Sequence, residues 1–292
     1  MRHLVSIMLL AVVSSGCLAT WESGWVGAPQ RGTAAGDAAR LLEKAHRFER
    51  DAGDAAGLLA AIAAFERVLE VDPGHPEALA RAAQYYLLYG TGYAQETDEK
   101  GRYFRAGIRL SERLMARNAA FKQLVDEGAT VWDASHALTA KEADAMGWWT
   151  TGVFYYFKEC VADSAKLFSH KWLVRNKQVM DQLDRVAPRW HSGANYFNYG
   201  IYYLALPEAV GGSMKRSAEY LEKAAALDRA RLLVPWGRAK YFHRKRKDAD
   251  AYRKDLEWVL AQDPRRPTVD GYAWNSYFQR EARVLLPLAD EL

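Results

Sequence analysis

The sequence is short of several features that would define common protein classes. It has only two cysteines, Cys17 and Cys160, so it cannot carry a disulfide framework. It has no run of about 18 apolar residues, which excludes an ordinary transmembrane helix. Proline and glycine are sparse, with 9 and 21 residues, so a folded chain is expected. The net charge of +4 is too small to indicate a nucleic-acid-binding protein.

The sequence also has little that points to catalysis. Its seven histidines stand at positions 3, 46, 75, 136, 170, 191 and 243, and none has metal-ligand spacing. No phosphate-binding glycine loop and no nucleophile elbow is present. We therefore expect no catalytic residue, metal or cofactor, and a binding protein rather than an enzyme. A catalytic triad built from distant residues would leave no such pattern, so an enzyme stays a third alternative.

The N-terminus is typical of an export signal. Arg2 gives a short positive region, and Leu4 to Val13 is an apolar stretch too short to span a bilayer. Small residues then precede Cys17, a pattern similar to a bacterial lipobox in which that cysteine is lipidated. Leu18, rather than Asp, follows it, which favours the outer membrane. The alternative is an ordinary signal peptide with a chance cysteine.

Three regions follow from this interpretation. Residues 1–16 are expected to be the signal peptide, and residues 17–36 the lipidated cysteine with a flexible tether. Residues 37–292 are expected to form one helical-repeat domain. If Cys17 is acylated, Cys160 has no partner for a disulfide, and its aromatic helical surroundings predict a buried thiol.

A repeated helical spacing gives the fold class. Ala61, Phe65, Val68 and Pro73 stand at relative positions 0, 4, 7 and 12, which puts three packing residues on one helical face before a proline ends the helix. This is half of a tetratricopeptide signature. Similar patterns end at Asn118, Pro188, Arg229 and Pro264.

The repeats are irregular in length, so extra segments are expected at 90–100, 119–140 and 205–213. Helix pairs that cannot bury their own apolar face have to stack. We therefore predict an all-α fold: an α-solenoid of divergent tetratricopeptide-like hairpins with a C-terminal capping helix from about Tyr272 to Ala289.

The sequence resembles one known family. Residues 202–213, which run Tyr-Tyr-Leu-Ala-Leu-Pro-Glu-Ala-Val-Gly-Gly-Ser, and the helix expected after them resemble the TRAP transporter T-component (TatT) family. Residues 64–68 and 256–264 agree with it. The resemblance implies a bacterial lipoprotein that works beside the periplasmic solute-binding protein of a tripartite ATP-independent transporter. It also implies a homotrimer as one assembly, and an apolar pore that accepts a hydrophobic small molecule.

An aromatic stretch at 147–160 has two faces at helical spacing. Trp149, Val153, Tyr156 and Cys160 form one stripe, which we interpret as core. On the other stripe Trp148 and Tyr155, with Gly152 as a gap and Glu159 at the end, are candidates for lining a ligand channel. The alternative is that both faces are buried between hairpins.

The stretch 194–206 divides in the same way. Phe197, Ile201 and Leu204 are predicted to pack, and Asn195, Tyr199 and Tyr202 to bind a ligand or partner. Tyrosine is also common in cores, so packing is the alternative for this stripe as well.

A basic segment follows. Residues 229–247 hold eight Lys and Arg and no Asp or Glu. A solvated loop is the default interpretation, and electrostatic steering of an acidic partner or an anionic lipid surface is the alternative.

The helical periodicity supports a helical-repeat binding scaffold. The resemblance implies more: a periplasmic, lipid-anchored adaptor of a TRAP-type transport system that binds the solute-binding protein and a hydrophobic solute. The rival function is a scaffold for envelope or outer-membrane protein assembly with no small-molecule ligand. Neither function involves nucleic acid.

The lipobox gives a direct test. Cys17→Ala should abolish acylation and release the protein from the membrane fraction, because one thioether-linked cysteine carries the anchor. Cell fractionation and the intact mass of the protein measure this, with Cys160→Ala as the matched control that keeps the anchor. A Cys17→Ala protein that still partitions with membranes, beside a wild type without lipid mass, would contradict the lipobox.

Overall fold

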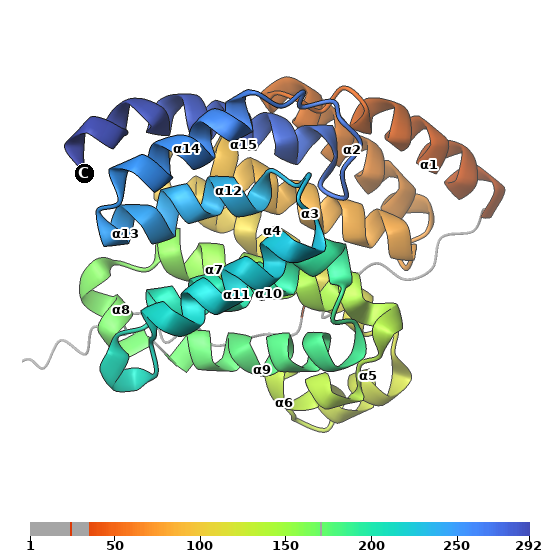
Figure 1. Cartoon of the computed structure of the whole chain (residues 1–292). Helices are drawn as coiled ribbons and strands as arrows, with labels where there is room; N and C mark the ends of the chain where they lie inside the picture. The colour runs from red at the N-terminus through yellow and green to blue at the C-terminus, as the bar shows by residue number, and fades with distance from the viewer. Residues whose placement is uncertain (1–23, 25–34, 170) are drawn as a thin grey trace, which may run out of the picture.

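The computed structural model describes residues 24, 35–169 and 171–292, and every regular element among them is helical. The predicted all-α fold is therefore confirmed. The helices pair into antiparallel hairpins that stack into a curved solenoid (Figure 1). The predicted signal peptide, Cys17 and nearly all of the predicted tether lie outside the described residues.

Five hairpins make up the stack. The first three pair α1 (Ala35–Glu49) with α2 (Ala55–Val71), α3 (Pro76–Gly92) with α4 (Thr97–Met115), and α7 (Ala143–Cys160) with α9 (Lys171–Val186). The fourth pairs α10 (Ala194–Ala205) with α11 (Met214–Leu227). In the fifth, α12 (Leu233–Gly237) continues through a π-helical turn (Arg238–His243) into α13 (Arg244–Arg246) and packs on α14 (Ala249–Leu260).

The repeated spacing predicted the second helix of each hairpin. In α2, Asp54 caps the N-terminus by accepting a hydrogen bond from the Gly57 N–H at 2.8 Å. Ala61, Phe65 and Val68 are fully buried on one face. The helix ends at Val71, just before Pro73. Helices α4, α9, α11 and α14 likewise end two to four residues before the predicted end positions.

The extra segments were predicted in part. The segment 119–140 holds α5 (Ala119–Asp126), α6 (Val131–Ala134) and a short 3-10 turn, and 205–213 holds another 3-10 turn (Glu208–Val210). The expectation for 90–100 was wrong, because α3 runs to Gly92 and α4 starts at Thr97. The additional length there lies in longer helices. A further short helix, α8 (Asp163–Ser169), joins α7 to α9.

The basic segment is not a solvated loop. It forms α12, the π-helical turn and α13, and several of its cations have partners within the fold. Arg238 makes an ion pair with Asp255 at 2.7 Å, Lys240 pairs with Glu281, and Lys245 donates to the Leu204 carbonyl at 2.7 Å. Charge composition alone could not show these contacts, because the acids lie on other helices.

The C-terminal helix closes the solenoid rather than only capping its last hairpin. Helix α15 (Gly271–Leu285) packs on α14 and α12, and a 3-10 helix (Leu286–Glu291) follows it. Its Arg280 also donates to the Gly92 carbonyl at the end of α3 at 2.7 Å and lies 4.0 Å from the centre of the Tyr93 ring. Figure 1 shows α15 beside the first hairpins. The last helix therefore contacts both ends of the stack.

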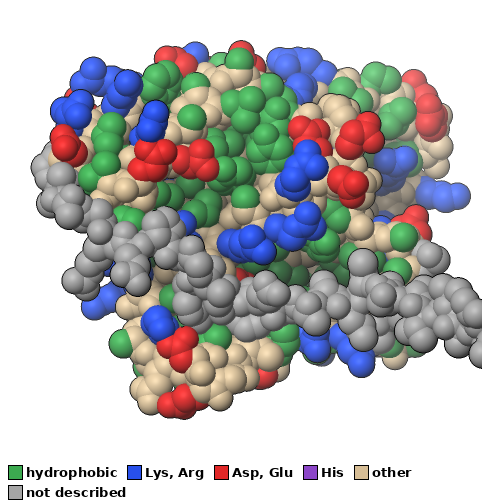
Figure 2. All heavy atoms as spheres, turned by 180° about the vertical axis from the view of Figure 1, so that it is seen from behind, with side chains coloured by type: hydrophobic (Ala, Val, Ile, Leu, Met, Phe, Trp, Pro, Cys, Tyr) green, Lys and Arg blue, Asp and Glu red, His purple; other side chains and the backbone are tan. Residues whose placement is uncertain are grey.

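One face of the molecule carries an apolar area. Seen from behind, hydrophobic side chains gather in the upper centre, with acidic and basic side chains beside them (Figure 2). Apolar areas of this kind are common where one protein binds another.

The predicted core stripe of α7 is partly right. Trp149 and Val153 are buried, but Tyr156 and Cys160 are half-buried. The Tyr156 hydroxyl accepts a hydrogen bond from Arg105 at 3.2 Å, so this end of the stripe meets solvent. Burial still raises the pKa of the Cys160 thiol to about 11.

The core position of Trp149 gives a stability prediction. The side chain is fully buried, and its indole N–H donates to the buried Glu112 carboxylate at 3.0 Å. Trp149→Ala should lower the free energy of unfolding by about 3–5 kcal/mol, because it leaves a large cavity. Trp149→Phe should cost less, since it keeps most of the packing. Denaturant melts measure both, with the exposed Val284→Ala as control; equal melts for Trp149→Ala and the control would contradict this core position.

Candidate functional site: an aromatic cavity inside the solenoid

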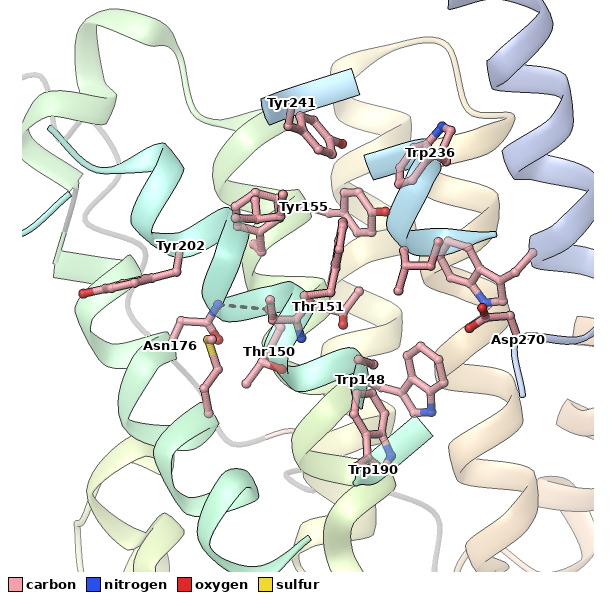
Figure 3. Close-up of a pocket in the computed structure, with 18 of the residues that line it drawn as sticks. Trp148, Thr150, Thr151, Tyr155, Asn176, Trp190, Tyr202, Trp236, Tyr241 and Asp270 are labelled. Carbon is pink, nitrogen blue, oxygen red and sulfur yellow. Dashed lines mark hydrogen bonds between the residues drawn. The ribbon is translucent and has the colours of Figure 1, made fainter. Parts of the chain in front are cut away.

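A cavity of about 60 Å³ lies where the third, fourth and fifth hairpins meet the C-terminal helix. Its walls come from α7, α9, α10, α12 and α15, so residues from Trp148 to Phe278 contribute to one partly enclosed space. Figure 3 shows Trp148, Tyr155, Trp236 and Tyr241 around it. Because one water needs on the order of 10–15 Å³ on this scale, the space suits roughly four waters.

Aromatic rings form most of the cavity wall. Trp148 is stacked against Trp274 of α15, with ring centres 6.4 Å apart and planes at 6°. It also meets Trp190 edge to face at 5.4 Å. Trp236 and Phe278 pack at 4.8 Å. Because these large, rigid rings are held by one another, they do not collapse into the cavity, and the cavity keeps its shape.

Several polar atoms in the wall are buried without a hydrogen-bond partner among the described residues. They are the Asn176 side-chain oxygen, the Asn198 side-chain nitrogen and the indole nitrogens of Trp236 and Trp274. The Asn176 amide nitrogen is satisfied, since it donates to the Thr150 carbonyl at 3.0 Å (Figure 3). Buried polar groups normally find partners, so such atoms point to water or a ligand. A mostly apolar wall with a few polar groups is the usual lining of a small-molecule site.

The wall tyrosines stay neutral. Burial raises the pKa of Tyr241 to about 12 and the pKa of Tyr155 well above its ordinary value. The Tyr241 hydroxyl lies 3.2 Å from the Lys158 ammonium, which donates to it. These phenols can therefore act as hydrogen-bond donors or acceptors but carry no charge.

Three of the five candidate site residues line the cavity. They are Trp148, Tyr155 and Tyr202. Phe197 and Ile201, which the sequence assigned to packing, line it as well. The sequence pattern placed Tyr202, Phe197 and Ile201 on the correct helix, α10. It assigned them to separate packing and binding stripes, whereas residues of both stripes line the cavity.

Asn195 and Tyr199 lie outside this cavity. Asn195 is fully buried, and its side chain donates to the Met180 carbonyl at 2.9 Å. The Tyr199 hydroxyl donates to Asp181 at 2.7 Å, and its ring stacks on Tyr220 at 4.8 Å. Both residues join neighbouring helices, which is the packing alternative.

Gly152 and Glu159 of the proposed channel stripe have other roles too. A Cβ at Gly152 would lie 2.7 Å from Ile108, so this glycine permits close contact between α7 and α4. Glu159 makes an ion pair with Lys100 at 3.1 Å. Neither residue lines the cavity.

A buried ion pair at the cavity wall was not predicted from the sequence. The side chains of Arg231 and Asp270 are each 4% exposed, and the guanidinium makes two hydrogen bonds to the carboxylate, one at 2.6 Å. Arg231 also donates to the His191 carbonyl. The sequence shows Arg231 directly before an apolar segment, which is a weak sign of a buried charge. It does not identify the partner, because Asp270 follows 39 residues later.

The turn that receives this hydrogen bond has an unusual backbone. His191 and Ser192 have φ angles of 42° and 49°, in the left-handed region that side chains with a Cβ rarely adopt. The following Gly193, at φ 88°, adopts it readily. Non-glycine residues in this region persist only where the surrounding structure holds them, and the bond from Arg231 is one such constraint.

Two further observations limit what the described residues can do. No group of His, Cys, Asp and Glu among them is arranged to hold a metal ion. None of their helices combines the length and the apolar character needed to cross a bilayer.

The hairpin stack and its aromatic cavity define a helical-repeat protein. A family model described as TRAP transporter T-component matches residues 54–292, which is most of the chain. The chain therefore belongs to the TRAP transporter T-component family, which is an accessory component of that transport system. A comparison with curated proteins finds no match.

The ion pair gives the next prediction. Asp270→Asn should lower the free energy of unfolding by about 3–5 kcal/mol, because it leaves the buried Arg231 charge uncompensated. Replacing both residues, as Arg231→Met with Asp270→Leu, should recover part of that loss. Urea unfolding of the three proteins measures this, and Asp290→Asn in the exposed Arg253 pair is the control. If Asp270→Asn and the control have the same free energy of unfolding, the Arg231–Asp270 pair does not stabilise the cavity wall.

Proposed function

We propose that this protein is a periplasmic, lipid-anchored adaptor of a TRAP-type transport system that binds the solute-binding protein and receives a hydrophobic solute in its internal cavity. Membership of the T-component family supports the transport role. The aromatic cavity with its unpaired polar wall atoms carries the ligand part of the proposal.

The cavity restricts the size of the part of the solute that it holds. A volume of about 60 Å³ is less than half of the roughly 150 Å³ that holds a benzene ring, so a ring would bind here only with some movement of the wall side chains. The indole N–H groups of Trp236 and Trp274 would favour a group that accepts hydrogen bonds. We therefore expect small aromatic groups to bind better than long saturated chains.

The partner would bind on the outside of the solenoid. Closure by α15 leaves the cavity residues buried, so a second protein cannot reach most of them directly. The apolar area on the face in Figure 2 supports an external contact of this kind. A homotrimer would use part of the same outer surface.

A cavity-filling variant tests the ligand part. Ile201→Phe adds carbon atoms to the cavity wall and should abolish binding of a neutral aromatic probe such as indole, with a modest cost in stability of about 1–3 kcal/mol. Isothermal titration calorimetry measures the binding. Ile62→Phe makes the same change in α2, at a buried site outside the cavity, and should leave the binding intact.

Binding of the solute-binding protein is measured in parallel by surface plasmon resonance. Indole binding that survives Ile201→Phe, or no indole binding by wild type, would contradict the cavity as the solute site. Retained partner binding without any solute binding would favour the scaffold function instead.

A further inference from the structure

An open groove of about 450 Å³ lies between α2 and α4 and shares no lining residue with the aromatic cavity. Each of the two helices contributes one stripe of side chains at intervals of three or four residues, which covers two helical turns or about 10 Å. The groove therefore has the length of two turns of a helix or of about three extended residues. The stripes are Leu59, Ile62, Ala63 and Glu66 from α2, and Glu99, Arg102, Tyr103 and Ala106 from α4.

The groove is lined by tyrosine rings and exposed aliphatic side chains. Tyr86 of α3 and Tyr103 of α4 both line it, are half-buried, and have ring centres 5.8 Å apart. Tyr103 also packs on Tyr89, at 4.4 Å. Leu59 is 39% exposed, and Ala63 is exposed beside it. Rings that their neighbours hold in place, next to exposed apolar groups, are typical of the centre of a protein–protein interface.

Two carboxylates stand in opposite walls of the groove. Glu66 of α2 accepts a hydrogen bond from the Tyr86 hydroxyl, and Glu99 of α4 accepts one from the Gln95 backbone N–H at 3.1 Å. Neither carboxylate makes an ion pair with any described residue. Burial, and then the hydrogen bond to Glu66, raise the pKa of Tyr86, so this phenol stays neutral and leaves the charge of Glu66 in place.

The lining therefore has an excess of negative charge. Arg102 is its cation; it is exposed and makes no ion pair with a described residue. One guanidinium stands against the two carboxylates of Glu66 and Glu99. The faces of the Tyr86 and Tyr103 rings add to the attraction for a cation, since the π-system of an aromatic ring is negative on its face.

The charges beside the groove do not reverse this balance. Arg67 pairs with Glu70 at 2.7 Å, so the two cancel. Arg105 donates to the hydroxyl of Tyr156 on α7 and is not part of the lining. Asp98, in the first turn of α4, is exposed and makes no ion pair with a described residue. The groove is thus an apolar, tyrosine-lined surface with acidic side chains on both sides.

We propose that this groove binds an apolar segment of a partner protein that carries lysine or arginine side chains. The inference rests on the proposed function, because it names the outer surface through which the adaptor binds its partner. Apolar side chains of the segment cover Leu59 and the Tyr103 ring. A cationic side chain of the segment reaches Glu66 and Glu99, and its methylene stem lies along the Tyr86 ring.

Two designed peptides test the chemistry of the groove. One is an amphipathic helical peptide of leucine and lysine, and the other has glutamate in place of every lysine. With the full chain, calorimetry should detect binding of the lysine peptide and none of the glutamate peptide. The affinity for the lysine peptide should fall as salt is added, because ions in solution screen exposed charge pairs.

Variants in the two walls assign the peptide to the groove. Ala63→Lys should weaken binding of the lysine peptide and Ala63→Glu should strengthen it, each by about threefold, as expected for an exposed charge contact. Both side chains suit an exposed helix position, so thermal melts should match wild type. Glu66→Gln with Glu99→Gln should weaken binding by about tenfold. The matched control, Glu208→Gln with Glu222→Gln, removes two exposed acids outside the groove and should leave binding unchanged.

The same variants are measured with the solute-binding protein by surface plasmon resonance. Its affinity should rise with Ala63→Glu and fall with Ala63→Lys, as for the lysine peptide. A solute-binding protein that does not associate with wild type would contradict the proposed function, and the peptides would then decide on the groove alone. Association that is equal in wild type and both Ala63 variants would overturn the groove as the site of this partner.

Three other results would overturn the inference. Equal binding of the two peptides to wild type would contradict the selection for cations. Loss of lysine-peptide binding in the Glu208 and Glu222 control would place the contact elsewhere. Sedimentation velocity tests a second copy of this chain as the occupant: an assembly of wild type that Ala63→Lys converts to monomers would assign the groove to a contact between copies.

Discussion

Arg231 joins the starts of three helices that wall the cavity. It precedes α12, its carboxylate partner Asp270 precedes α15, and the carbonyl it binds belongs to His191 before α10. These positions are about 40 residues apart in sequence, so one guanidinium fixes the starts of three helices relative to one another. A guanidinium suits this task, since its donors point in several fixed directions at once. The buried charge is tolerable only because all of these contacts form together.

Closure of the solenoid follows from the same arrangement. Asp270 directs the chain into α15, which contributes Trp274 and Phe278 to the cavity and Arg280 to the end of α3. Without α15 the cavity would have no wall on that side. The side chains that a more open solenoid would present on its inner surface are therefore buried here. The aromatic rings of these helices contact one another around the cavity. Because the rings are flat and rigid, they do not fill the space between the helices completely.

Local spacing was sufficient to predict the hairpins, but it could not predict the cavity. Ala61, Phe65 and Val68 pack within one hairpin, so their period of three to four residues carries the information. Whether Tyr202 or Tyr199 meets the cavity depends on which neighbour lies beside each face of α10. Tyr199 meets Asp181 and Tyr220, whereas Tyr202 meets the junction with later helices. The Arg231–Asp270 pair has no local pattern at all, since neither residue has a periodic partner.

In the proposed function, the closed solenoid would separate solute binding from partner binding. A solute in the cavity would not compete with a protein partner, because α10, α12 and α15 shield the cavity lining. The outer face in Figure 2 carries both apolar and charged side chains, which a protein partner would contact. Trp148 lines the cavity and also an open groove between the start of α3, the start of α7 and the turn before α10. The neighbouring turn, with His191 and Ser192 in left-handed conformations and tied to Arg231, fixes the groove wall beside this ring. Any movement of that turn would therefore displace both the Trp148 ring beside the groove and the Arg231–Asp270 ion pair that holds the three helices.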